Sequence, residues 1–346
     1  MNPFIQIGSR NIGLDCPPLV IPEIGINHEG DFTKAKRMVL DARLADAEIV
    51  KFQCHVIEDE MVPAAKQTIP GNAKESIWDI MARCALTAEQ DGELKRLTES
   101  LGMIYLSTPF SRAAADRLER MGVVAYKIGS GECNNYPLID HIASFGKPII
   151  LSTGMNDISS IVRAVDIFRA RSVPYALMHC TSLYPTPYPQ IRLGALAQLC
   201  EAFPDAVLGL SDHSIGNYAC YGATALGASI LERHFTSDKT WPGPDIPLSM
   251  DLKELKELIH GSRAIFEARG GEKTILPDEQ PTIDFAYASV VTIKPIKQGE
   301  QLNYGNIWVK RPGTGEIKAV DFFRIIGKNA IVNLEEDMQL KWEYFV

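Results

Sequence analysis

The chain has 346 residues and a formal net charge of −8 at pH 7. This length allows one large core and a smaller appended unit, whereas the acidic balance excludes the broad basic face that nucleic acid or an anionic membrane surface requires. Seven scattered cysteines without a C-x-x-C pair indicate a reduced, cytoplasmic protein and argue against a disulfide framework or a zinc ribbon. Residues 1–13 are predicted to form a short hairpin, and no signal peptide or membrane span is expected.

Eight short apolar segments are predicted to be β-strands, and each is followed by a stretch with helical periodicity. They cover residues 19–25, 47–53, 103–108, 124–130, 148–153, 175–180, 206–212 and 229–235. Strands that are apolar on both faces and alternate with helices are typical of a parallel sheet covered by helices. Eight such units predict an α/β fold, a closed (β/α)8 TIM barrel, over residues 1–275. An open doubly wound sheet is the alternative, but no strand is followed by a G-x-G-x-x-G turn.

Two segments depart from this repeat. The connection over residues 54–87 is long for a loop, and we expect it to cover the active site. A Gly- and Pro-rich stretch follows the last helix, and short alternating segments come after it. They predict a linker over residues 276–285 and a small β-rich domain over residues 286–346.

Polar or ionisable residues end nearly every predicted strand on its C-terminal side. They are Glu23, Lys51, Gln53, Ser107, Thr108, Lys127, Ser130, Glu132, Ser152, Thr153, His179, Thr181, Ser211, Asp212, His213, Glu232, Arg233 and His234. In a (β/α)8 barrel these ends meet on one rim, where the active sites of this fold lie. Burying so many ionisable groups on one side is costly unless they are paired or used, so the pattern predicts a functional rim.

The two histidines that end neighbouring strands, His213 and His234, could share one divalent cation. Two histidine ligands with open positions for water and substrate oxygens suit Mn²⁺ or Mg²⁺ better than structural zinc. A pair of neutral core histidines, or one general base, is the alternative. Glu232 and Arg233 are predicted to pair with each other, and Cys180, inside an apolar run, is predicted to be an inert core thiol.

The two lysines at strand ends, Lys51 and Lys127, could surround a phosphate or a carboxylate together with nearby hydroxyl groups. Alternatively they form internal ion pairs with Glu23 or Glu132. A Schiff base on one of these lysines is a further alternative, for which the surrounding hydroxyls and carboxylates are unfavourable. Glu23 is either a general acid or base or the partner of a lysine.

Short motifs distributed along the chain point to a known family. They read PEIGINHEGD (22–31), VKFQ (50–53), QTIPGN (67–72), STPFSR (107–112), YKIGSGECNNYPLI (126–139), LSTGM (151–155), HCTSLYPTPY (179–188), GLSDHS (209–214), LERHFT (231–236), GPD (243–245) and WVKRPGTG (308–315). Together they resemble the sialic acid synthase family, and bacterial N-acetylneuraminate synthases in particular, over almost the whole chain. The resemblance implies a (β/α)8 barrel followed by an antifreeze-protein-like (SAF) domain. It also implies a domain-swapped homodimer in which each small domain caps the partner's barrel.

The resemblance further implies the residues of the site. His213 and His234 would hold Mn²⁺, with Mg²⁺ or Co²⁺ as alternatives, and Arg311 would contact the substrate N-acetyl group across the dimer. Phosphoenolpyruvate would be bound by Lys51, Thr108, Lys127, Ser130, Ser152, Ser182 and Ser211. The sugar would be bound by Gln53, Asn72, Phe110, Glu132, Tyr184, Asp245 and Phe285.

The implied reaction condenses phosphoenolpyruvate with N-acetylmannosamine and water to give N-acetylneuraminate and phosphate. Glu23 is expected to activate the water, and Lys51 and Lys127 are expected to stabilise the phosphate and carboxylate charges. A legionaminic acid or other nonulosonate synthase, which uses a 2,4-diacetamido-6-deoxy hexose, is the alternative within this class. A carbohydrate-binding barrel without catalysis is the alternative outside it, and the full set of charged residues argues against that reading.

Overall fold

The computed structural model describes residues 2–71 and 73–346, and the chain divides into two compact units, Met1–Gly270 and Gly271–Val346. Asn72, a predicted sugar contact, lies outside the described residues. The predicted linker over 276–285 contains the 3₁₀ turn Pro277–Glu279 and most of helix α12 (Gln280–Ala286).

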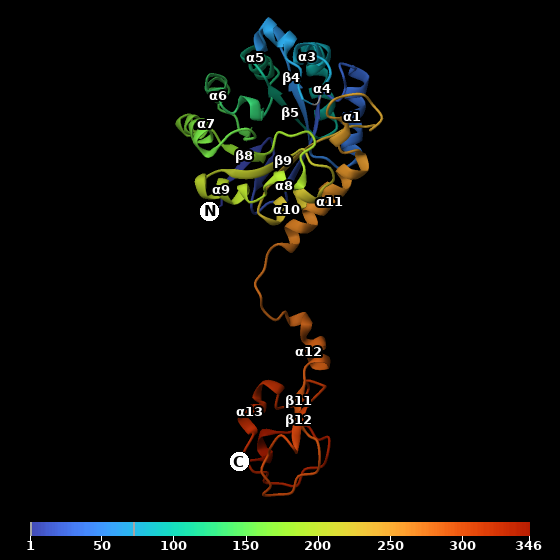
Figure 1. Cartoon of the computed structure of the whole chain (residues 1–346), viewed down its shortest axis with the longest axis vertical. Helices are drawn as coiled ribbons and strands as arrows, with labels where there is room; N and C mark the ends of the chain where they lie inside the picture. Colours follow the sequence, from blue (N-terminus) through green and yellow to red (C-terminus); the bar gives the residue numbers. More distant parts are fainter. Residues whose placement is uncertain (1, 72) are drawn as a thin grey trace. The chain divides into compact units, whose positions relative to one another are not determined.

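The first unit is a (β/α)8 barrel, as predicted (Figure 1). Its eight parallel strands, all within the described residues, are β3 (Leu19–Gly25), β4 (Ile49–Cys54), β5 (Ile104–Pro109), β6 (Tyr126–Ile128), β7 (Ile149–Ser152), β8 (Tyr175–Cys180), β9 (Val207–Asp212) and β10 (Ile230–His234). They run in the order β5-β4-β3-β10-β9-β8-β7-β6, and β5 contacts β6. Successive strands are therefore neighbours and the last lies beside the first, which excludes the doubly wound alternative.

Helices follow the strands and cover the outside of the barrel (Figure 1). They include α1 (Phe32–Leu44), α4 (Ala88–Ser100), α5 (Arg112–Arg120), α6 (Tyr136–Ala143), α7 (Ile158–Ala170), α9 (Ala195–Ala202), α10 (Tyr218–Ala225) and α11 (Leu252–Ala268). Several begin at a side chain that accepts hydrogen bonds from first-turn N–H groups: Asp31, Thr87, Ser111, Asn135, Asp157 and Asp251. Such caps fix where each helix starts after its strand.

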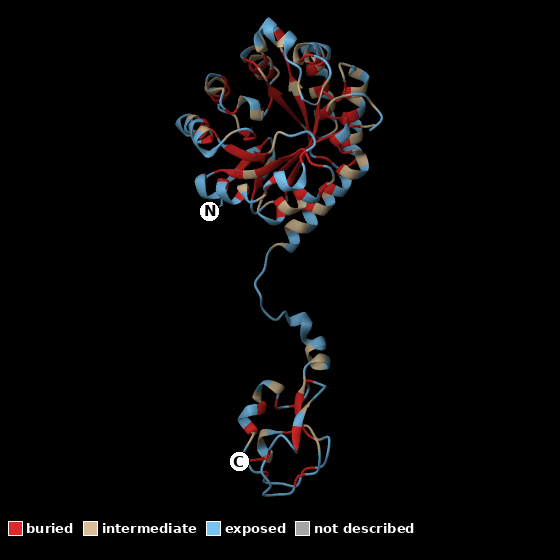
Figure 2. Cartoon of the chain, in the orientation of Figure 1, coloured by how far each residue is buried: buried red, intermediate tan, exposed pale blue. Residues whose placement is uncertain are grey.

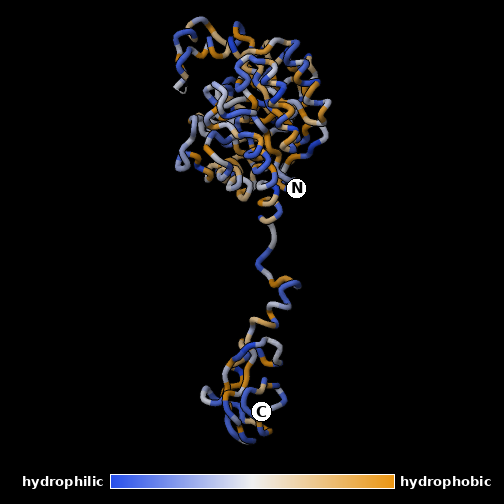
Figure 3. The backbone as a smooth tube through the Cα atoms, turned by 90° about the vertical axis from the view of Figure 1, so that its right-hand side faces the viewer, coloured by the Kyte–Doolittle hydropathy of each residue, from blue (hydrophilic) through white to orange (hydrophobic). Residues whose placement is uncertain are grey.

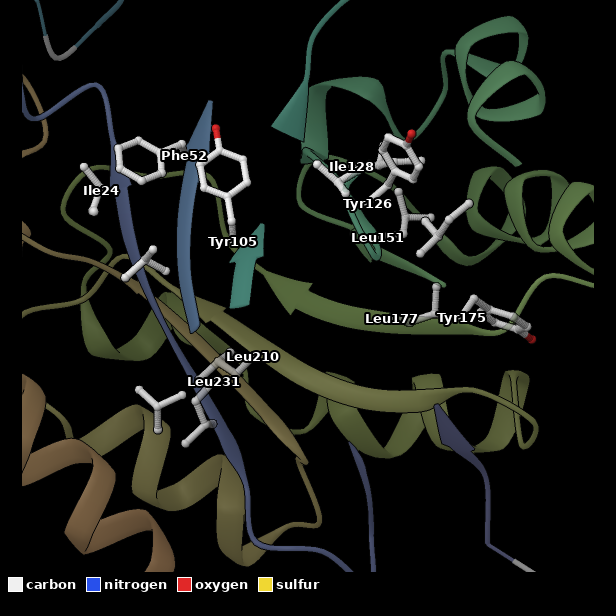
Figure 4. Close-up of a cluster of buried hydrophobic side chains, with 14 of the residues drawn as sticks. Ile24, Phe52, Tyr105, Tyr126, Ile128, Leu151, Tyr175, Leu177, Leu210 and Leu231 are labelled. Carbon is white, nitrogen blue, oxygen red and sulfur yellow. The ribbon is translucent and has the colours of Figure 1, made fainter. Parts of the chain in front are cut away.

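Side chains alternate along each strand between the outside and the inside of the barrel. Outward residues such as Phe52 and Leu231 form a hydrophobic layer beneath the helices (Figure 4), and most strand positions are buried (Figure 2). The inward residues nearest the N-terminal ends are also apolar. The predicted hairpin, β1 (Phe4–Ile7) and β2 (Arg10–Gly13), is confirmed and packs against them through residues such as Ile12. Apolar side chains thus close the barrel interior at the N-terminal ends of the strands, and the polar residues lie towards the C-terminal ends.

The second unit is a small β-rich domain. Strand β11 (Ser289–Thr292) pairs antiparallel with β12 (Ile307–Lys310), and isolated bridges extend this pairing. The short helix α13 (Phe322–Ile325) contributes to its separate hydrophobic core. Hydrophilic and hydrophobic positions alternate over short distances along the chain (Figure 3), and no helix in its described part is long and apolar enough to cross a membrane.

Candidate active site

A cavity of about 450 Å³ lies at the C-terminal ends of the barrel strands. Most residues predicted for the site line it: Glu23, Lys51, Gln53, Thr108, Phe110, Lys127, Ser130, Ser152, Ser182, Tyr184, Ser211, His213, His234 and Asp245. They come from all of the barrel strands or from the loops that follow them. The structure thus gathers residues that are far apart in the sequence into one site.

The segment over 54–87, predicted to cover the active site, contributes several residues to one wall of this cavity. It contains α2 (Ile57–Glu60), the 3₁₀ helix Pro63–Gln67 and α3 (Ile77–Cys84). Ile77 lines the cavity, and the apolar face of α3 packs against Ile26 after β3. The backbone of Gly30, which has φ +79°, lies close to the backbone of Arg83 in α3. A Cβ added at Gly30 would lie 2.2 Å from the carbonyl oxygen of Arg83. We call residues 54–87 the cover segment.

Two lysines and two carboxylates form a buried ionic cluster at the bottom of the cavity. Lys51 Nζ lies 2.7 Å from Glu23 Oε2 and 3.7 Å from Glu232 Oε1, and Lys127 Nζ lies 3.5 Å from the same Glu232 oxygen. The lysines therefore share Glu232, and the predicted alternative of a Lys51–Glu23 ion pair is present. Because two ammonium groups face two carboxylates, the cluster as a whole carries little net charge.

Burial and pairing act in opposite directions on these groups. Burial raises the pKa of Glu232, but Lys127 and Lys51 lower it more, so the net shift is downward. Burial lowers the pKa of Lys51, but Glu23 and Glu232 raise it above its ordinary value. Burial lowers the pKa of Lys127, and this effect prevails over the attraction of Glu232. The protonated form is therefore stabilised less at Lys127 than at Lys51.

The predicted pair of Glu232 with Arg233 is wrong. Adjacent residues of a strand point to opposite faces, so Glu232 points inward and Arg233 outward. Arg233 Nε lies 3.3 Å from Asp212 Oδ2, and its other nitrogens donate to Asn217 and to backbone carbonyls. Glu232 lines the cavity and is the main residue whose role was missed. The period of two in Ile230, Glu232 and His234 is the signal that could have found it.

Hydroxyl groups surround the two lysines. Lys51 Nζ donates to Thr108 Oγ1 at 3.2 Å, and Lys127 Nζ donates to Ser152 Oγ at 2.7 Å. Ser211 Oγ lies 3.3 Å from Glu232 Oε1. These hydroxyl groups can donate to an anion that displaces a carboxylate from a lysine.

A second group of donors lies beside these, around Gly154. Its N–H donates to Ser130 Oγ at 3.0 Å. A Cβ at Gly154 would lie 2.5 Å from Ser182 Oγ, 2.8 Å from Ser130 Oγ and 3.2 Å from Cys180 Sγ. Gly154, which lies in the motif LSTGM (151–155), was not among the predicted site residues, although any side chain there would collide with these groups. Cys180 was predicted to lie in the core as an inert thiol. It is buried, but it lines the cavity, so the predicted core location is wrong.

The two histidines lie side by side, with ring centroids 5.5 Å apart, and the ring of Tyr184 lies 4.2 Å from that of His213. Nδ1 of His213 lies 3.0 Å from the carbonyl oxygen of Thr181. A carbonyl only accepts, so this nitrogen carries a proton and Nε2 is the one that could bind a metal. Burial lowers the pKa of His213, but the nearby Cys180 side chain and the Thr181 carbonyl raise it more, to about 9, so a metal at Nε2 would have to displace a proton.

The other histidine, His234, is buried, and burial lowers its pKa. Within the described residues its Nδ1 has no hydrogen-bond partner, although Asp245 Oδ2 lies 3.9 Å away. A neutral imidazole with an unused nitrogen suits a metal ligand. No group of three or more His, Cys, Asp or Glu side chains in 2–71 and 73–346 is arranged to hold a metal. The two histidines fit a divalent cation whose remaining ligands are oxygens of substrate and water.

Among the described residues, three of the predicted sugar contacts do not line the cavity, and neither do six of the predicted rim residues: Ser107, Thr153, His179, Thr181, Asp212 and Arg233. Glu132 lies in a neighbouring cavity of about 910 Å³, which shares Phe110 with the first, and it accepts a hydrogen bond from Asn135 at 2.6 Å. Phe285 and Arg311 belong to the second unit, where the Arg311 guanidinium lies 5.8 Å from the centroid of the Phe285 ring. Those two predicted sugar contacts are therefore close to each other.

The fold and the cavity define an enzyme of the (β/α)8-barrel class, with buried lysine ammonium groups and hydroxyl groups at the C-terminal rim. Comparison with known proteins identifies the family. The chain belongs to the NeuB family, whose profile matches residues 38–274, and a SAF domain profile matches residues 287–346.

Similar proteins span nearly the full chain. The chain is 37% identical to N,N'-diacetyllegionaminic acid synthase of Campylobacter jejuni over 92% of this chain and 97% of that protein. It is 32% identical to human N-acetylneuraminate-9-phosphate synthase over 95% and 92% of the two chains. The crystal structure of N-acetylneuraminic acid synthetase from Leptospira borgpetersenii, in complex with citrate, has 31% sequence identity and a TM-score of 0.75 and covers 82% of this chain and 96% of that one.

Proposed function

We propose that this protein is a nonulosonate synthase that condenses phosphoenolpyruvate with N-acetylmannosamine and water to give N-acetylneuraminate and phosphate. The observation that carries the proposal is the pair of buried lysines, Lys51 and Lys127, which share Glu232 among hydroxyl groups at the bottom of the cavity. Two buried lysines whose carboxylate partners can be displaced by an anion suit a substrate that carries both a phosphate and a carboxylate. The relatives named N,N'-diacetyllegionaminic acid synthase and N-acetylneuraminate-9-phosphate synthase support a nonulosonate synthase.

Phosphoenolpyruvate would bind through the lysines and the hydroxyl groups around them. Lys51 with Thr108, and Lys127 with Ser152, are placed to donate to its anionic oxygens. Ser130, Ser182 and Ser211 line the same cavity and add donors. Since the four-residue ionic cluster is nearly neutral, the negative charge of the substrate calls for a further cation nearby. That need is the physical argument for a divalent metal.

His213 and His234 would hold this metal, with Mn²⁺ favoured over Mg²⁺ or Co²⁺. When bound, the metal supplies Lewis acidity that polarises the aldehyde of the open-chain sugar. Tyr184 and Asp245, which lie beside the histidines, would orient the sugar together with Gln53 and other cavity residues.

Glu23 would take a proton from the attacking water. Carbon-3 of phosphoenolpyruvate forms the new bond to the sugar aldehyde carbon, whose oxygen takes up a proton and becomes a hydroxyl, and carbon-2 becomes electron-poor. Water adds to carbon-2 as Glu23 takes one of its protons. The tetrahedral centre then breaks its C–O bond to release phosphate, and its hydroxyl loses the remaining proton to leave the ketone. Lys51, 2.7 Å from Glu23, would steady that carboxylate and the departing phosphate charge.

A domain-swapped homodimer completes the proposal. Arg311 and Phe285 lie close together on the second unit, which suits a single contact with the N-acetyl group of the sugar. In the proposed dimer these residues come from the partner chain. Each active site would then contain residues of both copies.

A legionaminic acid synthase is the second candidate. It is favoured by the relatives of that name, which are 37% and 34% identical to this chain. Both candidates use the same phosphoenolpyruvate chemistry and differ in the sugar.

Phosphate release distinguishes the candidates. The protein is incubated with Mn²⁺, phosphoenolpyruvate and one of three sugars: N-acetylmannosamine, its 6-phosphate, or a 2,4-diacetamido-6-deoxy hexose. We expect the highest kcat/KM with N-acetylmannosamine and no release without sugar. Turnover of the diacetamido sugar alone would establish the second candidate. Sugar binding without any phosphate release would overturn both and indicate a carbohydrate-binding barrel.

A further inference from the structure

A chain of three hydrogen bonds leads from Glu23 into the cover segment. Gln53 Nε2 donates to Glu23 Oε1 at 3.1 Å. Gln53 Oε1 lies 3.1 Å from His55 Nε2, and His55 Nδ1 lies 2.8 Å from Glu60 Oε2. The reaction proposed above uses Glu23 and Gln53 but assigns no role to His55 or Glu60.

The direction of each hydrogen bond follows from its two ends. A carboxylate only accepts, so the NH₂ group of Gln53 faces Glu23 and its carbonyl oxygen faces His55. His55 therefore donates from Nε2. Because the Glu60 carboxylate also only accepts, Nδ1 donates as well. A ring that donates from both nitrogens is an imidazolium, and Glu60 balances its charge.

The surroundings hold this arrangement in place. The side chain of His55 is 2% exposed and that of Glu60 is 12% exposed. The His55 ring stacks on Phe110, a cavity residue, with centroids 4.6 Å apart and an interplanar angle of 11°. Next to Glu60, Asp59 accepts a hydrogen bond from the N–H of Ala113 at the start of α5, at 2.7 Å. Helix α2 of the cover segment is thus anchored where it presents Glu60.

We propose that the Glu60–His55 pair is a positioning device for Glu23. By donating to the carbonyl of Gln53, His55 prevents the amide from flipping, and the NH₂ group of Gln53 then holds one oxygen of Glu23. The other oxygen faces Lys51. The catalytic consequence rests on the proposed function, whereas the hydrogen-bond chain itself does not. The device also couples the cover segment to the base, because Glu60 belongs to the cover segment and Glu23 belongs to the barrel.

A double-mutant cycle of His55→Ala and Gln53→Ala tests whether His55 acts through Gln53. We expect His55→Ala to lower kcat about tenfold with little change in the KM for phosphoenolpyruvate. In the Gln53→Ala background the same substitution should change kcat less than about twofold. His55→Gln keeps one donor and should retain more activity than His55→Ala. Equal losses in both backgrounds, or full activity of His55→Ala, would overturn the proposal.

The matched control is His141→Ala. His141 forms a similar pair with Asp116, at 2.7 Å, but on the outer helices and without contact with Glu23 or Gln53. Its removal should leave kcat unchanged. If His141→Ala lowered kcat as much as His55→Ala does, a general effect of losing a His–carboxylate pair would explain both, and the proposal would be wrong.

A second readout requires no turnover. ¹⁵N-histidine NMR of the substrate-free protein should show both ring nitrogens of His55 protonated, with the signal assigned by its loss in His55→Ala. Glu60→Gln should abolish this signature, because an amide can present its NH₂ group and does not balance the charge. A neutral His55 in the wild type would overturn the proposal. If the protein released no phosphate with any sugar, the proposed function would fail, and this spectrum would still decide the hydrogen-bond chain.

Discussion

The carboxylate of Glu232 lies 3.5 Å from the ammonium nitrogen of Lys127, and both side chains are almost fully buried inside the barrel. The same carboxylate is shared with a second buried lysine, Lys51. In the proposed reaction a substrate anion would take over part of this pairing. The cluster is therefore stable without substrate and also able to receive an anion.

Glu232→Gln should destabilise the protein by about 3 kcal/mol, because two buried cations lose a shared counter-charge. Phosphoenolpyruvate should restore part of that loss, so its stabilising effect should be larger in the variant than in the wild type. Urea denaturation with and without the ligand measures both. The control, Glu99→Gln, removes an exposed i,i+4 partner of Lys95 and should cost less than about 0.5 kcal/mol. If Glu232→Gln were as stable as the wild type, Glu232 would not be the counter-charge that stabilises both lysines.

His234→Ala should lower Mn²⁺ affinity at least about tenfold and abolish turnover, because one of the two proposed ligands is lost. Calorimetric titration with Mn²⁺ measures the first effect, and circular dichroism checks the fold. The control, His260→Ala, removes an exposed histidine on α11 and should leave both Mn²⁺ affinity and turnover unchanged. Full activity of a metal-stripped wild type would rule out the metal.

His28→Asn should make stability less sensitive to acid. His28 is buried, and burial, with a smaller effect of His55, lowers its pKa from 6.5 to about 4. Between these pH values the unfolded chain binds a proton that the folded chain does not, so the free energy of unfolding falls as pH falls from 6.5 to 4. The full effect is on the order of 3 kcal/mol. Urea denaturation at pH 7 and pH 4.5 should show a smaller loss in the variant, and equal losses would contradict this origin.

Mixing a Glu23→Gln protein with an Arg311→Ala protein tests the domain swap. If each site takes Glu23 from one chain and Arg311 from the other, a mixed dimer contains one intact site. Random exchange of chains should therefore restore about one quarter of wild-type activity from two inactive parents. Sites built from a single chain would show no recovery.

The strands and the rim could be predicted because both depend on local pattern. Runs such as residues 19–25 are apolar on both faces, and a polar residue at the end of each strand stands out against them. The predicted strand limits agree with the structure to within two residues. Parallel strands of a barrel bring these ends together, so the composition of the cavity followed from the fold.

The partners of individual charges could not be predicted in the same way. Glu232 and Arg233 look like a pair in the sequence, but the strand directs them to opposite faces, and their partners depend on the register with β9 and on the packing of other strands. Cys180 lies on the cavity wall beside Gly154, where an added Cβ would come within 3.2 Å of its Sγ, and this contact between segments far apart in the chain has no local signal. The contact of His55 with Glu60 depends on how the cover segment folds back, which no local pattern specifies.

The buried lysine cluster is proposed to support condensation of phosphoenolpyruvate with an N-acetylated sugar and water by C–O cleavage. Phosphoenolpyruvate labelled with ¹⁸O in its bridging oxygen tests this most directly, in the presence of Mn²⁺ and N-acetylmannosamine. We expect sugar-dependent release of phosphate that retains the bridging ¹⁸O, detected by mass spectrometry. Release of unlabelled phosphate, with the ¹⁸O left on the carbon product, would contradict C–O cleavage.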